Sequence, residues 1–118
     1  LAITPFGPTS GGLLTGKYRY GEPAPPGSRM ALRPQPYQHL LNQRTFRSID
    51  ALRAAAAQRG VATGALALAW VLSQPQVTAA LIGPRGVEHF APWLEAVDIH
   101  LTSAEREALV SQMEAVAA

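Results

Sequence analysis

The sequence predicts an α/β fold in which parallel strands alternate with helices. Two short apolar runs, residues 1–4 and 77–82, have the composition of strands that are covered on both faces. Helical periodicity fills the stretch between the runs and the stretch after the second one, which gives the order strand, loop, helices, strand, helix, helix. Two strands cannot form such a sheet alone. We therefore expect missing sequence or another copy of the chain to complete it.

The composition is that of one small domain with enough apolar material for a core, 118 residues of which 47% are hydrophobic. The net charge is +2 and the arginines do not cluster, so nothing supports nucleic-acid binding. The chain has no cysteine, which excludes disulfides and thiolate zinc sites and fits a cytoplasmic location. No stretch approaches the roughly 20 apolar residues of a membrane span. No signal-peptide pattern opens the chain, and its start inside an apolar run suggests a piece of a longer protein.

A glycine-rich loop, residues 5–18, follows the first apolar run and ends near Lys17. Glycines let backbone N–H groups approach a bulky anion, and such groups together with a lysine hold phosphates. The loop is not a P-loop, because no Gly-Lys-Ser/Thr opens a helix. For the loop taken alone, an ordinary strand-to-loop turn is the favoured interpretation.

Residues 19–44 contain five prolines and little periodicity, and we interpret them as a long irregular excursion. Loops of this length in compact domains are functional or disordered. The triplet Gly27-Ser28-Arg29 is the one place in the excursion where a positive charge stands beside turn residues.

Two helices are predicted next. The first begins near Asn42 or Thr45, either of which can cap it, and stops at Gly60. The second begins at Thr63 as its N-cap and is apolar over nearly its whole circumference, which predicts burial on most sides. Trp70 is interpreted as a packing residue of this helix.

The second apolar run closes with Gly83-Pro84-Arg85, and a helix with one apolar face follows it. Pro92 falls inside this helix, where a proline costs about 3 kcal/mol unless the helix begins there. Thr102 and Glu105 form a capping box that opens a last helix.

Several motifs resemble, in family order, the C-terminal part of aldo-keto reductases. The family's usual segment after strand seven is Tyr-Ser-Pro-Leu-Ala-x-Gly-Leu-Leu-Thr-Gly-Lys-Tyr, and the matching run here is Phe6-Gly7-Pro8-Thr9-Ser10-Gly11-Gly12-Leu13-Leu14-Thr15-Gly16-Lys17-Tyr18. Residues 65–72 look like the family's seventh helix, and residues 82–85 are similar to its strand-eight exit.

The resemblance implies the C-terminal portion of a (β/α)₈ TIM barrel, incomplete on its own. It assigns strand seven and the cofactor loop to residues 1–18, the irregular loop to 19–44 and helices to 45–74. Strand eight with a phosphate loop falls on residues 77–85, and the C-terminal helices fall on 86–118. Barrels of this type often hold phosphate in the loops after strands seven and eight.

The resemblance also implies that the cofactor is NADP(H), with NADPH as the hydride donor. The implied reaction is reversible hydride transfer to an aldehyde or ketone. Arg85 corresponds to the residue that meets the adenosine 2′-phosphate, where a guanidinium fork suits a doubly charged group. The family's cofactor-binding positions fall on Phe6, Gly7, Pro8, Thr9, Ser10, Gly11, Gly12, Lys17, Arg29, Gly83, Arg85 and His89.

The chain departs from the family pattern at several positions. Gly7 stands where the family has serine, and His89 replaces a glutamine. Pro92 and Trp93 replace a Glu-Asn pair that hydrogen-bonds the adenine, and Trp93 can at best stack. The family's catalytic aspartate, tyrosine, lysine and histidine lie on earlier strands, and no segment here matches them, so we assign no catalytic residue.

Two readings of the chain remain open. In the first, it is the cofactor-binding part of a reductase; in the second, it is a non-catalytic remnant that self-associates, with weakened or lost cofactor binding. Lys17 and Arg85 can also be ordinary surface residues, Arg85 as a helix cap. We interpret the tyrosines as packing residues of the loops and not as catalytic acids: Tyr18, Tyr20 and Tyr37. The histidines are not spaced as metal ligands are, so we expect no metal site: His39, His89 and His100.

Overall fold

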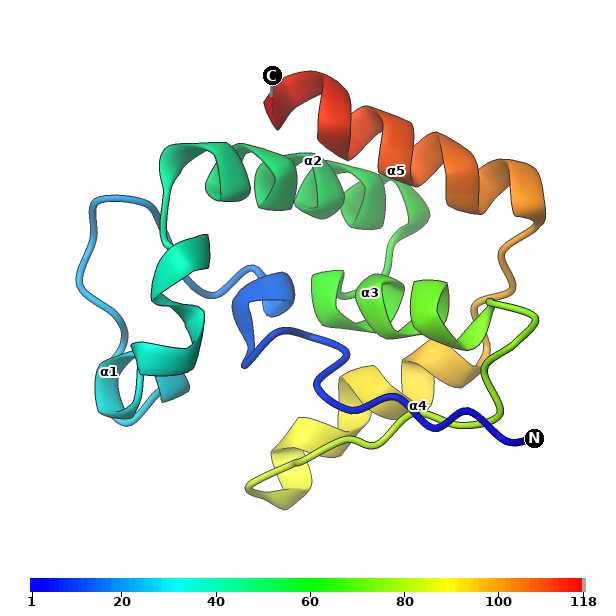
Figure 1. Cartoon of the computed structure of the whole chain (residues 1–118), viewed down its shortest axis with the longest axis horizontal. Helices are drawn as coiled ribbons and strands as arrows, with labels where there is room; N and C mark the ends of the chain where they lie inside the picture. The colour runs from blue at the N-terminus through cyan, green and yellow to red at the C-terminus, as the bar shows by residue number, and fades with distance from the viewer. Residues whose placement is uncertain (118) are drawn as a thin grey trace.

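A computed structural model describes residues 1–117, so Ala118, the last residue of the expected segment 86–118, lies outside the described residues. The four longest α-helices are α2 (Gln43–Arg59), α3 (Thr63–Leu72), α4 (Phe90–Val97) and α5 (Ser103–Ala117). Figure 1 shows α2 and α5 side by side, α3 in the middle and α4 on the opposite side of α3. The helix α3 is therefore packed between other elements.

The main core surrounds α3, as its apolar sequence predicts. Every residue from Gly64 to Ala69 is buried. Leu52 of α2, Ala96 of α4 and Leu109 of α5 contribute to the same cluster. Trp70 packs against this core, and its indole nitrogen donates to the carbonyl oxygen of Arg106 at 3.4 Å. The interpretation of Trp70 as a packing residue is confirmed.

A smaller second core lies under the glycine-rich loop and the excursion. Tyr18 is buried there, and its hydroxyl accepts a hydrogen bond from the amide of Met30 at 3.3 Å. The excursion itself contains two short helical pieces, α1 (Arg29–Leu32) and the 3-10 helix η2 (Gln35–Leu40), so it is less irregular than predicted. The other members of this core come from the loop and from α2: Leu13, Phe46 and Ile49.

The two segments predicted as strands lie side by side and run parallel, as expected. The prediction that each forms a regular strand was wrong, because only one bridge forms between them and no regular strand occurs within residues 1–117. One bridge joins Phe6 to Leu81. The amides of Thr78 and Leu81 donate to the carbonyl oxygens of Ile3 and Pro5, both at 2.9 Å. Within residues 1–117, each segment pairs with no extended segment other than its partner. An isolated pair of strands is at best marginally stable.

Helix ends follow the predicted caps with one exception. Asn42 caps α2, since its side-chain oxygen accepts from the amide of Thr45 at 2.9 Å, and Gly60 ends α2 at φ 68°. The predicted N-cap of α3 at Thr63 was off by one residue, because Ala62 holds that position. Alanine has no capping oxygen, so no side chain at the N-cap binds the first amides of α3. The Ala62 amide itself donates to the Glu95 carboxylate of α4 at 2.7 Å.

Pro92 lies in the first turn of α4, after the 3-10 helix η3 (Val87–His89). The N–H groups of a first helical turn have no intrahelical acceptor, so a proline there removes no hydrogen bond. The cost expected for a proline inside the helix therefore does not arise.

No single helix within residues 1–117 combines the length and apolar character needed to cross a membrane. Helices α2 and α3 meet that requirement only when taken together, and they are bent by 94° at their junction.

Candidate functional site

The glycine-rich loop turns back on itself through left-handed backbone conformations. Gly7, Ser10, Gly11 and Gly12 all have positive φ, and Ser10, at 50°, is the one non-glycine residue of this kind in residues 1–117. The amide of Ser10 donates to the carbonyl oxygen of Gly7 at 3.0 Å, and that of Gly12 donates to Thr9 at 3.1 Å. Including these two, six amides of the loop donate to carbonyl oxygens within it: those of Ser10, Gly12, Leu13, Leu14, Thr15 and Gly16.

Two side chains lie directly on the glycines of this loop. A Cβ added to Gly11 would stand 2.5 Å from the Cζ atom of Tyr37, so the tyrosine ring covers the Gly11 backbone. The Lys17 Nζ atom lies 3.2 Å from the position that a Gly12 Cβ would take, and 5.3 Å above the centre of the Tyr18 ring. The structure thus brings Lys17 back onto the loop that precedes it.

Both predicted phosphate loops leave the paired segments on the same side. Because Phe6 and Leu81 pair in parallel, the residues after each of them, including Gly7 and Gly83, leave at the same end. Phe6 itself is 85% exposed, and no atom lies within 4 Å of where a Gly83 Cβ would stand. Phosphate sites of (β/α)₈ barrels lie at this end.

Arg85 connects the second loop to the excursion. Its Nη1 atom donates to the carbonyl oxygen of Gly27, 58 residues earlier, at 2.7 Å. Its backbone amide donates to Nδ1 of His89 at 3.0 Å, and the His89 Nε2 atom lies 3.8 Å from a Glu88 carboxylate oxygen. The structure therefore brings Arg85 and His89 together, and it places Arg85 beside the turn that carries Arg29.

Ser28 is a candidate that the sequence reasoning passed over. Its hydroxyl oxygen is buried and has no hydrogen-bond partner within residues 1–117. It stands between Gly27, which Arg85 contacts, and Arg29. The sequence did show a serine beside an arginine at the start of a helical turn. That this turn belongs to the candidate site could not be recognised, because it depends on the contact between Arg85, from a distant loop, and Gly27.

Trp93 packs against the main core, and its indole nitrogen is buried without an acceptor within the described residues. Its neighbour Pro92 has no N–H to donate. Neither residue offers the hydrogen bonds that the Glu-Asn pair of the resemblance would supply.

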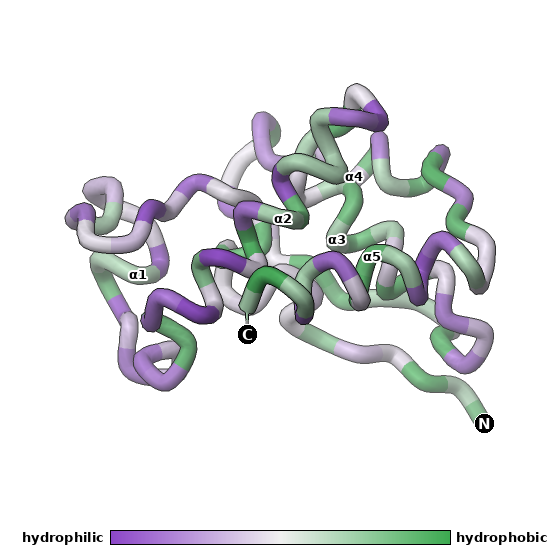
Figure 2. Tube along the Cα trace, turned by 90° about the horizontal axis from the view of Figure 1, so that it is seen from above, coloured by the Kyte–Doolittle hydropathy of each residue, from purple (hydrophilic) through white to green (hydrophobic). Residues whose placement is uncertain are grey.

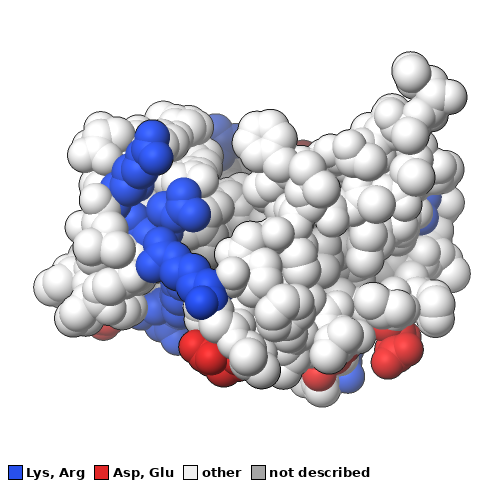
Figure 3. Space-filling model, turned by 90° about the horizontal axis from the view of Figure 1, so that it is seen from below, with Lys and Arg blue, Asp and Glu red and all other residues white. Residues whose placement is uncertain are grey.

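Positive charge gathers on one side of the molecule, so the expectation that the arginines do not cluster was wrong. Figure 3 shows Lys and Arg side chains in a band on the side of the molecule that carries α1 and the excursion. No group of three or more histidine, cysteine, aspartate or glutamate side chains in residues 1–117 is arranged to hold a metal ion. Anion binding by arginine and lysine is the chemistry that this side of the molecule offers.

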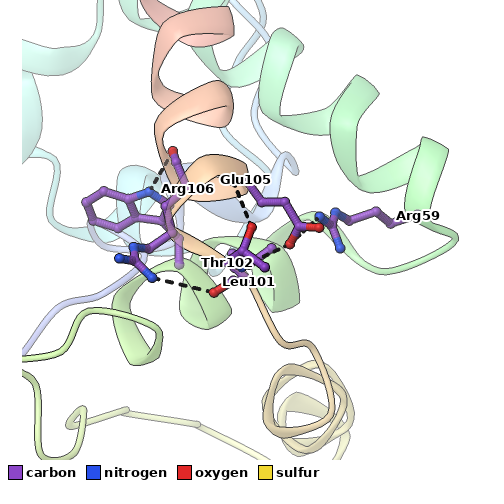
Figure 4. Close-up of polar contacts among 6 residues, drawn as sticks. Arg59, Leu101, Thr102, Glu105 and Arg106 are labelled. Carbon is purple, nitrogen blue, oxygen red and sulfur yellow. Dashed lines mark hydrogen bonds and ion pairs between the residues drawn. The ribbon is translucent and has the colours of Figure 1, made fainter.

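The clearest electrostatic perturbation lies away from the loops, at the start of α5 (Figure 4). The Thr102 amide donates to Glu105 Oε2 at 3.0 Å, and the Glu105 amide donates to Thr102 Oγ1 at 3.1 Å, which confirms the predicted capping box. The hydrogen bond from Thr102 lowers the pKa of the Glu105 carboxyl, partial desolvation opposes this, and the Arg59 charge 3.4 Å away lowers the pKa further.

Two parallel segments, each followed by helices, are the arrangement of a portion of a βα barrel. The family model described as the aldo/keto reductase family matches residues 1–114, and the chain belongs to this family. The resemblance noted in the sequence is confirmed.

Relatives are known from plants and bacteria. The chain is 34% identical over 103 residues to a probable voltage-gated potassium channel subunit beta of Oryza sativa, which covers 84% of this chain and 30% of that protein. It is 34% identical over 106 residues to L-glyceraldehyde 3-phosphate reductase of Escherichia coli, covering 86% of this chain and 30% of that protein.

A solved structure shares the fold. The glycerol dehydrogenase of Gluconobacter oxydans matches with a TM-score of 0.76 and 25% identity, over 98% of this chain and 35% of that one. The chain spans about 30% of the length of the curated relatives it matches.

Proposed function

We propose that this chain is the part of an NADP-dependent aldo-keto reductase that holds the phosphates of the cofactor. When bound, NADPH would supply the hydride that is transferred to an aldehyde or ketone. The observation that supports this proposal is the parallel pairing of Phe6 with Leu81, which sends the glycine-rich loop and the Arg85 loop out at one end. A cytoplasmic location, in agreement with the absence of cysteine, belongs to the same proposal.

The residues at this end fit a phosphorylated dinucleotide. Phosphate oxygens are acceptors, and the buried Ser28 hydroxyl without a partner is an available donor. Arg85 and Arg29 supply guanidinium groups, and Lys17 supplies an ammonium group on the glycine-rich loop. We propose that Arg85 binds the 2′-phosphate, while the Phe6–Gly12 loop and Lys17 face the pyrophosphate and nicotinamide side, with Gly83 and His89 lining the second loop.

Titration calorimetry with NADPH and NADH tests this assignment. Hydrogen bonds to charged groups contribute about 1.5–3 kcal/mol each, so a few of them support micromolar to millimolar affinity. NADPH should bind more tightly than NADH, and added salt should weaken both. Arg85→Ala should erase the preference for NADPH while leaving NADH almost unaffected.

Arg33→Ala is the matched control, because Arg33 is an exposed arginine just after α1 that we do not place in the site. It should keep the preference for NADPH. Equal affinity of the wild-type chain for the two cofactors would refute the role of Arg85.

A second candidate function is that of a non-catalytic remnant that self-associates. The positions of Pro92 and Trp93 favour it, since neither offers a hydrogen bond to an adenine. No binding of either cofactor, together with an oligomer in size-exclusion chromatography, would support this alternative.

A further inference from the structure

The side chain of His89 binds the main chain of Arg85 through a contact that depends on the protonation of the imidazole ring. The Arg85 amide donates to Nδ1 of His89 at 3.0 Å. A ring nitrogen that accepts a hydrogen bond carries no proton, so the ring is neutral and its proton lies on Nε2. A second proton would occupy Nδ1 and turn the acceptor into a donor. Protonation of the ring therefore breaks the contact with the amide.

The charged groups around the His89 ring come from its own segment. The Glu88 carboxylate lies 3.8 Å from Nε2 of the ring. Helix α4, which packs against η3, carries no charged side chain before Glu95, and the Glu95 carboxylate binds the amide of Ala62. The Arg85 guanidinium group reaches the excursion instead. The His89 side chain is 46% exposed, so the ring exchanges protons with the solvent directly.

Arg85 is held at both ends, by His89 at the main chain and by the Gly27 carbonyl oxygen at the guanidinium group. Little else packs on this loop, since Arg85 is exposed and no atom lies within 4 Å of where a Gly83 Cβ would stand. The excursion that the guanidinium group reaches has many hydrophilic residues around α1 (Figure 2). Without the His89 contact, the backbone from which the guanidinium group extends is free to change conformation.

We propose that His89 is a positioning residue that makes the choice between the two cofactors depend on pH. Its unprotonated Nδ1 holds the Arg85 backbone in the conformation from which the guanidinium group binds the 2′-phosphate, and protonation of the ring releases that backbone. The preference for NADP over NAD therefore decreases as the ring becomes protonated, which for histidines occurs between about pH 8 and pH 5. This inference rests on the proposed function. It gives His89 an effect through Arg85, where the family resemblance gives it a contact with the cofactor.

An asparagine at position 89 separates the contact from its protonation. The Oδ1 atom of asparagine stands two bonds beyond Cβ, as Nδ1 of histidine does, and it accepts hydrogen bonds without titrating. His89→Asn should therefore keep the contact with the Arg85 amide at every pH, whereas His89→Ala removes it. His100→Asn is the matched control, because His100 is an exposed histidine that follows α4 and lies outside the proposed site.

The first measurement needs no cofactor. In proton–nitrogen NMR spectra of the labelled chain, the Arg85 amide resonance should shift as the pH falls from about 8 to about 5.5, with the same midpoint as the resonances of the His89 ring. In His89→Asn, the Arg85 amide resonance should not shift in this range. In His100→Asn, it should shift as in the wild type.

The second measurement is titration calorimetry with NADP⁺ and NAD⁺ at about pH 8 and about pH 5.5. A phosphate monoester itself takes up a proton near about pH 6. This change of the ligand is common to all variants, so the effect of His89 is the difference between the wild type and His89→Asn. On acidification, the preference of the wild type for NADP⁺ should fall about twofold to tenfold further than that of His89→Asn, which corresponds to the loss of one hydrogen bond. His89→Ala should show the reduced preference already at about pH 8.

An Arg85 amide that does not respond to pH in the wild type, or that responds equally in His89→Asn, would overturn the inference. A wild-type preference for NADP⁺ that follows the His89→Asn preference at both pH values would also overturn it. A wild-type preference that rises on acidification relative to His89→Asn would do the same, because an imidazolium that binds the phosphate directly predicts that sign. If neither cofactor binds, the proposed function fails and the effect on specificity fails with it, while the NMR spectra still decide whether His89 holds Arg85.

Discussion

Gly11 and Gly7 have nearly the same backbone conformation, φ 67° and 63°, but very different surroundings. A Cβ at Gly11 would meet the Tyr37 ring at 2.5 Å, and one at Gly7 would meet nothing within 4 Å. Gly7→Ala should therefore cost only the left-handed strain, about 1–2 kcal/mol. Gly11→Ala should cost an additional 1–3 kcal/mol or so, because the ring must move.

Urea denaturation of the two variants measures the difference. Adding Tyr37→Ala to Gly11→Ala should reduce the extra cost, since the clash is then gone. Equal losses of stability for the two glycine variants would show that Tyr37 does not lie on the loop in solution.

The lowered pKa of Glu105 should make the stability of the fold decrease as the pH falls below about 4.3. Its pKa is lower in the folded chain than in the unfolded one, so its ionised form stabilises the fold above the ordinary glutamate pKa of about 4.3. That contribution is lost as the pH falls from about 4.3 through the lower folded pKa. Glu105→Gln should therefore lose less stability than the wild type in this window.

Denaturant titrations between about pH 6 and pH 3 provide the measurement. Glu107→Gln, on the same helix, is the control, and it should keep the wild-type slope of stability against pH. Parallel curves for wild type and Glu105→Gln would contradict the prediction.

Among the elements, α3 begins without a side-chain cap. Ala62 at the N-cap position has no side-chain acceptor, and the Glu95 carboxylate of α4 accepts a hydrogen bond from the Ala62 amide itself at 2.7 Å. Glu95→Ala should cost about 0.5–1.5 kcal/mol, the usual net contribution of a hydrogen bond, because the contact is exposed. Ala62→Ser should stabilise the chain by about 0.5–2 kcal/mol with or without Glu95, because a serine cap accepts from the second or third amide of the helix, and φ −67° and ψ 145° at position 62 suit it.

A double-mutant cycle in thermal or chemical denaturation provides the measurement. The two changes should be nearly additive, since the serine and Glu95 bind different amides. A serine that stabilises only the Glu95→Ala background would contradict this assignment.

At the scale of the whole molecule, the isolated chain should not reduce carbonyl compounds. General acid catalysis needs a positioned proton donor, and the buried Tyr18 hydroxyl instead accepts from the Met30 amide. NADPH oxidation with a panel of aldehydes should equal the blank without enzyme. Oxidation above the blank that disappears in Tyr18→Phe would overturn this expectation.

Local signals in the sequence predicted the local structure well. The Asn42 cap, the stop at Gly60, the Thr102–Glu105 capping box and the burial of α3 are all present. Each depends on residues within a few positions of one another, or on the periodicity of one helix.

Features that depend on distant partners were predicted poorly. The apolar runs were assigned as strands, but an isolated pair of strands is at best marginally stable, and each run pairs with only one other segment in residues 1–117. The Ala62 amide at the start of α3 is bound by Glu95, and Arg85 reaches Gly27 across 58 residues. The Gly-Ser-Arg turn was noted in the sequence, but the buried Ser28 hydroxyl could not be recognised there. The cofactor role of the loop residues remains a prediction.

The contact between Arg85 and Gly27 holds the guanidinium group in place at this end of the molecule. Only the Nη1 atom donates to the Gly27 carbonyl oxygen, at 2.7 Å, and a guanidinium has five N–H donors, so a ligand can bind the others without displacing that carbonyl. A phosphate dianion gains more from these donors than a neutral oxygen does, because charged acceptors form hydrogen bonds about twice as strong as neutral ones. An arginine anchored in this way has already lost part of its side-chain freedom before an anion arrives.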